Sequence, residues 1–103
     1  MHPRQPLSAL ACRQAIQREV HLERERQDEK WGGPAFDDCN LPEDWTTYIN
    51  NHLEEVRAAF ADGDTGRARK ALIEVAALAV AAVESGDRKS AHVAGALPGK
   101  AAE

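Results

Sequence analysis

Residues 71–83 read ALIEVAALAVAAV, and this stretch decides the fold. The segment is apolar on every face of a helix, which is typical of a helix that is buried on all sides. A chain of 103 residues supplies only two other long helices, and two helices cannot surround a third. We therefore expect a helical bundle that is completed by a second subunit.

The chain before this segment predicts a first helix over residues 7–31. Cys12, Ile16 and Val20 recur at a spacing of four residues and give this helix an apolar edge. Gly32 and the residues that follow it are expected to end the helix. A loop is predicted over residues 32–40.

The second and third helices have recognisable start signals. Asn40 is expected to cap the second helix, with Glu43 completing a capping box, and this helix runs to about residue 61. Asp64 or Thr65 is expected to cap the third helix, which runs to about residue 85 with Gly86 as its stop. The predicted fold class is all-α, with three main helices.

The domain prediction follows from these helices. Residues 1–86 are expected to form a single helical domain, and residues 87–103, which are rich in Ala, Gly and Lys, a flexible or weakly ordered tail. No segment alternates with a period of two residues, so strands are not expected.

Composition restricts the classes of function. The formal net charge is -4, with 17 acidic and 13 basic residues, which argues against extended nucleic acid as a partner. Cys12 and Cys39 lie far apart, so neither a disulfide framework nor a zinc site is expected. The longest apolar stretch, residues 75–83, is about half as long as a membrane span. We expect a soluble protein in the reducing cytoplasm.

One carboxylate interrupts the apolar third helix. Glu74 lies in the middle of the segment, where a charge is costly unless it is paired, protonated or bound to a cation. A salt bridge to Lys70 or Arg67 is the structural alternative to a metal or substrate role.

Polar residues also intrude on the apolar face of the second helix. That face is formed by residues at helical spacing, namely Trp45, Tyr48, Ile49, Leu53, Val56, Ala59 and Phe60. His52 falls near the middle of this face, and Asn51 and Glu55 fall at its edge. Inward carboxylates on facing helices are how bundles build metal sites. The alternatives are an ordinary core histidine and, for Glu55, an ion pair with Arg57 or Arg67.

Two motifs resemble a known family. Residues 23–32 read ERERQDEKWG, which resembles the ERxRQxxKWG segment of many phage and bacterial MazG-like proteins, and residues 42–45 read PEDW, which resembles their PEEW helix start. The resemblance covers roughly residues 20–84. It implies a MazG-like domain of the all-α nucleoside triphosphate pyrophosphohydrolases. These proteins are homodimers or homotetramers that use a divalent metal to split a nucleoside triphosphate into monophosphate and pyrophosphate.

The metal motif of that family is incomplete in this chain. Its five acidic positions, EExxE and ExxD, correspond to Asn51, His52, Glu55, Ala71 and Glu74, so two carboxylates are kept. The resemblance assigns catalysis to Glu55 and Glu74, and metal binding to these two residues and His52. The metal would be Mg²⁺ or Mn²⁺, with His52 suiting Mn²⁺ better.

The resemblance also implies a substrate site. It comprises Gln27, Lys30, Trp31, Tyr48 and Asn51, with Lys30 and Trp31 meeting a phosphate and a base. The alternative for Trp31 is a hydrophobic cap on the bundle. The expected function is a MazG-like nucleotide pyrophosphohydrolase of impaired activity. The alternatives are a nucleotide-binding module without hydrolysis and a protein-interaction module on the same fold.

Overall fold

The computed structural model describes residues 8–93, which form helices joined by short turns, with no strand among them. Four helices follow one another: α1 (Ala9–Trp31), α2 (Gly33–Asp37), α3 (Pro42–Ala61) and α4 (Thr65–Val93). The predicted all-α class and the three long helices are confirmed, and the short α2 replaces part of the expected loop. Within residues 8–93, no helix combines the length and the apolarity that crossing a membrane requires.

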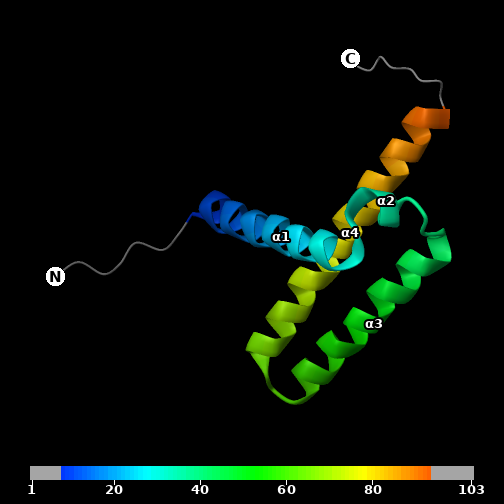
Figure 1. The fold of residues 1–103 in the computed structure, drawn as a ribbon. Coiled ribbons are helices and arrows are strands. Elements are labelled where there is room, and N and C mark those ends of the chain that lie inside the picture. Colours follow the sequence, from blue (N-terminus) through cyan, green and yellow to red (C-terminus); the bar gives the residue numbers. More distant parts are fainter. Residues whose placement is uncertain (1–7, 94–103) are drawn as a thin grey trace.

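Helix α4 is the centre of the arrangement. Figure 1 shows α3 and α4 as an antiparallel hairpin, with α1 crossing α4 near its middle and α2 beside the crossing. Helix α4 contacts each of the other three helices, whereas α1 and α3 do not contact each other. The apolar segment of residues 71–83 thus lies in the helix that all the others contact.

Helix α1 ends where the sequence predicts. Ser8 caps its start, because the Ser8 hydroxyl accepts the Ala11 N–H at 3.0 Å. Gly32 ends it with φ at 115°, a left-handed conformation that costs a residue with a side chain far more than glycine. The Gly32 N–H donates to the Asp28 carbonyl at 2.9 Å, which satisfies one of the last helical carbonyls.

The predicted cap of α3 is wrong, and that of α4 is confirmed. Leu41, not Asn40, is the N-cap residue of α3. The Leu41 N–H donates a hydrogen bond to the Asp44 carboxylate at 2.8 Å. The side chain of Asn40 is engaged elsewhere, in a hydrogen bond with Tyr48. At the start of α4, Asp64 Oδ1 accepts the backbone N–H of Arg67 at 3.0 Å, as expected of a cap.

The predicted stop at Gly86 is also wrong, since α4 continues to Val93. Three side chains around the glycine bind the segment between α2 and α3. The Ser85 hydroxyl donates to Asp38 at 2.7 Å, and the Arg88 guanidinium donates to the same carboxylate at 2.8 Å. Lys89 donates to the Asn40 carbonyl at 3.0 Å. These bonds offset the low helix propensity of glycine. Residues 94–103 of the expected tail lie outside the described residues.

The core of the single chain is made of small side chains. Its buried hydrophobic residues are Val56, Ala59, Ala68, Ala71, Ala77 and Ala81. Larger apolar side chains of α4 face outward, and Val83 is 63% exposed, with Leu72 and Val80 also exposed. Helix α4 is therefore not buried on every face within one chain.

The alanine core generates a first prediction. Ala59 is fully buried where α3 packs on α4, whereas Ala58 beside it is exposed. We expect Ala59→Leu to destabilise the fold by about 1–3 kcal/mol, because the added atoms push the helices apart. Ala58→Leu should change the free energy of unfolding by less than about 0.5 kcal/mol. Urea unfolding of both variants measures the difference, and equal stabilities would contradict this account of the packing.

Candidate binding site

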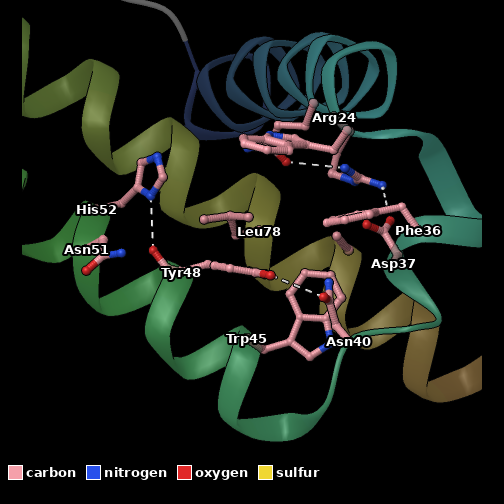
Figure 2. A pocket seen from close by; sticks show the side chains of 12 residues that line it. Arg24, Phe36, Asp37, Asn40, Trp45, Tyr48, Asn51, His52 and Leu78 are labelled. Carbon is pink, nitrogen blue, oxygen red and sulfur yellow. Dashed lines mark hydrogen bonds and ion pairs between the residues drawn. The ribbon is translucent and has the colours of Figure 1, made fainter.

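A pocket of about 270 Å³ lies where the four helices meet (Figure 2). It is lined by residues from the end of α1, from α2 and the segment after it, from the first half of α3 and from the middle of α4. The lining residues are Arg24, Gln27, Trp31, Phe36, Asp37, Asn40, Trp45, Tyr48, Asn51, His52, Leu78 and Ala81. Mostly apolar walls with a few polar groups are typical of small-molecule sites.

Aromatic rings form two walls of this pocket. Trp31 and Phe36 stack with their ring centroids 6.1 Å apart, and Trp45 meets Tyr48 edge to face, also at 6.1 Å. The left-handed Gly32 reverses the chain between the first two rings, so that α2 returns Phe36 toward Trp31. Flat aromatic faces bind flat rings through stacking and removal of apolar surface from water.

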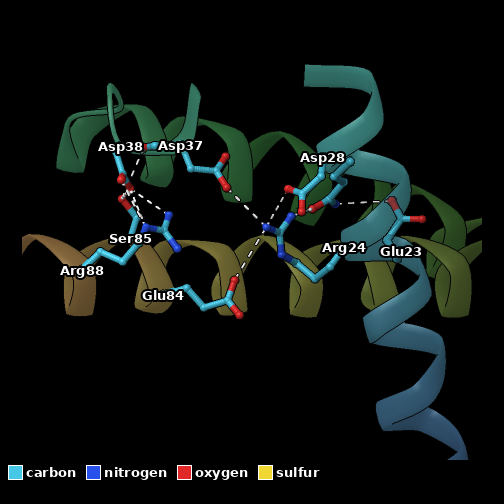
Figure 3. A network of polar contacts seen from close by, with 9 residues as sticks. Glu23, Arg24, Asp28, Asp37, Asp38, Glu84, Ser85 and Arg88 are labelled. Carbon is cyan, nitrogen blue, oxygen red and sulfur yellow. Dashed lines mark hydrogen bonds and ion pairs between the residues drawn. The ribbon is translucent and has the colours of Figure 1, made fainter. Parts of the chain in front are cut away.

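The Arg24 guanidinium holds the polar side of the pocket together (Figure 3). Arg24 is only 8% exposed, and its Nη1 donates to Gln27 at 3.2 Å. Its Nη2 lies 2.8 Å from Asp28, 3.3 Å from Asp37 and 3.7 Å from Glu84. One cation thus links α1, α2 and α4, and a buried charge of this kind is stable only while its partners remain.

Two neighbouring aspartates in this region have opposite pKa shifts. Burial raises the pKa of Asp37 above its ordinary value, although the nearby Arg24 charge acts to lower it. Hydrogen bonds from Arg88 and Ser85 lower the pKa of Asp38. The pocket therefore has a carboxylate in its wall whose charge is costly, next to one whose charge is well satisfied.

Asn40 occupies a buried position at the other side of the same pocket. It is 6% exposed, and its Oδ1 accepts the Tyr48 hydroxyl at 3.2 Å. Its backbone carbonyl accepts a hydrogen bond from the ammonium of Lys89. Its Nδ2 has no hydrogen-bond partner, and neither has Nε of Arg24. Buried polar groups are usually paired, so two orphaned donors in one pocket require an explanation.

The residues expected to bind metal come together only in part. His52 Nε2 lies 3.9 Å from Glu74 Oε1, and the Glu74 side chain is 15% exposed. The other ring nitrogen of His52 is 3.0 Å from the Tyr48 carbonyl, which fits an ordinary, backbone-bonded histidine. Glu74 also pairs with Lys70 at 3.2 Å, the salt bridge that the sequence offered as the alternative.

Glu55 takes the alternative role suggested by the sequence. It accepts Arg67 Nε at 2.6 Å, and its side chain is about half exposed. Among the side chains that the structure describes, residues 8–91, no three histidine, cysteine or acidic groups lie together so that they could hold a metal ion. The donor set of the single chain therefore does not fit the metal site that the family resemblance implies.

Four of the five expected substrate residues line the pocket: Gln27, Trp31, Tyr48 and Asn51. Lys30 does not line it, and its ammonium lies 4.9 Å from the centroid of the Trp31 ring, in a cation–π contact. Glu55 is also absent from the lining. The expected substrate site and the expected metal residues thus meet only at His52, which borders the pocket.

Three polar residues that line the pocket were not expected from the sequence, namely Arg24, Asp37 and Asn40. Arg24 stands in a charged run that resembles a solvated face, and Asp37 stands in what was expected to be a loop. Asn40 was assigned to a helix cap, and Trp45 to the apolar face and the PEDW helix start. Arg24 lies on the same helical face as Gln27 and Trp31, and this spacing could have linked it to the expected substrate residues.

No family model, no curated protein and no solved structure matches this chain.

The Arg24 cluster generates a second prediction. We expect Arg24→Met to destabilise the fold by about 3 kcal/mol or more, since it leaves Asp37 buried without its cation. The double variant Arg24→Met/Asp37→Leu should recover part of this loss. Arg57→Met is the matched control, because Arg57 and its partner Glu54 are both largely exposed and the pair should contribute less than about 1 kcal/mol. Chemical unfolding in which Arg24→Met and Arg57→Met lose equal stability would refute the structural role.

Proposed function

We propose that this protein binds a nucleotide in the aromatic pocket, as a MazG-like protein whose pyrophosphohydrolase activity is weak. The observation that carries the proposal is the pair of aromatic walls around a cavity of about 270 Å³. Such walls suit a nucleobase, because every base has flat faces on which aromatic rings stack. The motif around Trp31 and its contribution to one wall support the same ligand class.

The phosphates of such a nucleotide would extend past His52. His52 borders the pocket and contacts Glu74. Glu74 in turn pairs with the largely exposed ammonium of Lys70. The ammonium group of Lys70 is a donor that binds phosphate oxygens through charge-assisted hydrogen bonds. The proposal therefore places the base among the aromatic rings and the phosphates toward α4.

The carboxylate set argues for weak hydrolysis. Phosphoryl chemistry needs cations that neutralise the phosphates and position the attacking water. In this chain Glu55 forms an ion pair with Arg67, and the buried Ala71 stands where the family has a carboxylate. We therefore propose binding as the retained property, with hydrolysis reduced relative to the family.

We also propose that the protein works as a homodimer or homotetramer. Within the described part of the chain, Val56 is the one buried apolar residue larger than alanine. Meanwhile Leu72, Val80 and Val83 of α4 are exposed on the helix that organises the fold. A second copy would cover these side chains and supply the apolar burial that the small core lacks.

The nucleotide proposal is tested with an aromatic pair on α3. Trp45 lines the pocket, whereas Phe60 is exposed at the other end of the helix and does not. We expect Trp45→Ala to weaken nucleotide binding about tenfold or more, because stacking on one aromatic residue contributes about 1–3 kcal/mol. Phe60→Ala should leave the affinity unchanged. Isothermal titration with nucleoside mono- and triphosphates measures both.

Release of pyrophosphate from the same triphosphates separates binding from hydrolysis. We expect slow or undetectable release with Mg²⁺ and faster release, where any occurs, with Mn²⁺. Brisk Mg²⁺-dependent release would show that the altered residues form a working site after all. If none of the nucleotides gives a saturable heat signal in the titrations, the proposed binding itself is overturned.

The oligomer proposal predicts an effect of charge on the outer face of α4. Val83→Lys should shift the protein toward monomers by at least tenfold in the dissociation constant, because a buried, unpaired ammonium is costly in an interface. Ala58→Lys, on the exposed side of α3, is the control and should assemble like the wild type. Sedimentation velocity over a concentration series distinguishes them, and a wild type that stays monomeric at micromolar concentration rules the proposal out.

A further inference from the structure

We infer that Asn40 selects bases that carry a keto oxygen over bases that carry an amino group at the same position. The inference rests on the proposed function, because it specifies which nucleobases the aromatic pocket takes. It is carried by the Asn40 amide, a buried donor in the pocket wall with no partner in the protein.

The amide is oriented by a neighbour on α3. The Tyr48 hydroxyl donates to Asn40 Oδ1 at 3.2 Å, so the acceptor end of the amide is occupied (Figure 2). Lys89 holds the backbone of the same residue from α4. The group that remains for a ligand is Nδ2, which can only donate. Tyr48 thus acts as a positioning residue that fixes what Asn40 presents.

The second orphaned group in the pocket has the same character. Nε of Arg24 is also a buried donor without a partner, and Arg24 lines the pocket together with Asn40. In the side chains of residues 8–91, these are the two buried nitrogen or oxygen atoms that lack a partner, and both are N–H donors. A ligand that pairs them must bring acceptors, and leaving them unpaired in the complex would cost affinity.

The keto and amino bases differ at two adjacent groups. Uracil carries O4 and N3–H where cytosine carries an amino group and a bare N3, and hypoxanthine carries O6 and N1–H where adenine carries an amino group and a bare N1. The exocyclic group is the one that the Asn40 amide would meet. A keto oxygen accepts from Asn40 Nδ2, whereas an amino group would place donor against donor. A site built to hydrogen-bond one group discriminates strongly against an analogue that lacks it.

The experiment compares two matched pairs of ligands on the full chain. The dissociation constants of uridine and cytidine monophosphate, and of inosine and adenosine monophosphate, are measured by isothermal titration. We expect the keto member of each pair to bind at least tenfold more tightly. Asn40→Asp replaces the free donor by an acceptor and should abolish or reverse this preference.

Two further variants separate recognition from folding. Tyr48→Phe leaves the Asn40 side chain in place but frees the amide to turn over, so the keto preference should fall to about threefold or less. Asn50→Asp makes the same chemical change as Asn40→Asp at an exposed residue outside the pocket, and should keep the preference. A thermal melt of each variant checks folding, and Tyr48→Phe carries the test if Asn40→Asp does not fold.

The possible failures are distinguishable. Equal affinities within each pair, or a preference for cytidine and adenosine monophosphate, would overturn the inference and leave nucleotide binding intact. An unchanged keto preference in both Asn40→Asp and Tyr48→Phe would assign the selection to another group. Absence of binding for all four monophosphates and for the triphosphates would overturn the proposed function, and the inference with it.

Discussion

The rest of the structure depends on the buried guanidinium of Arg24. Helix α1 does not touch α3, and the Arg24 contacts with Asp37 and Glu84 connect it to both α2 and α4. That connection sets the position of Trp31 and Phe36 opposite Trp45 and Tyr48. The pocket exists because a polar cluster, and not a large apolar core, fixes the crossing of the helices.

The small core and the polar contacts complement each other. Alanines such as Ala59 and Ala77 let α4 approach its neighbours closely, but each contributes little apolar surface. Directional bonds then decide the register, as in the pairing of Arg88 and Ser85 with Asp38. Hydrogen bonds specify geometry more sharply than apolar contacts do, which explains how so small a core can support a defined site.

Local signals in the sequence predicted the helices well. Apolar periodicity identified the three long elements, Gly32 marked the end of α1, and Asp64 was correctly assigned as a cap. Gly86 misled the prediction because its cost is offset by tertiary bonds between residues far apart in the chain. Propensity describes a segment by itself and cannot include such bonds.

The candidate site was predictable only in part, for its aromatic and its polar residues alike. Trp31, Tyr48, Gln27 and Asn51 were expected from the family resemblance and line the pocket. Arg24 and Asn40 were missed, because a charged run and a helix start both have simpler explanations. Glu55 was assigned to metal but binds Arg67, a pairing that depends on the turn between α3 and α4.

The glycine within α4 has a dynamic consequence. Residues 87–93 form the outer end of a helix that glycine weakens, and they are held through Arg88 and Lys89 to the segment after α2. Fraying of this end and release of the Asn40 backbone are therefore one cooperative event. Such local opening would cost less free energy than global unfolding, and it would change one wall of the pocket without breaking the Arg24 contacts.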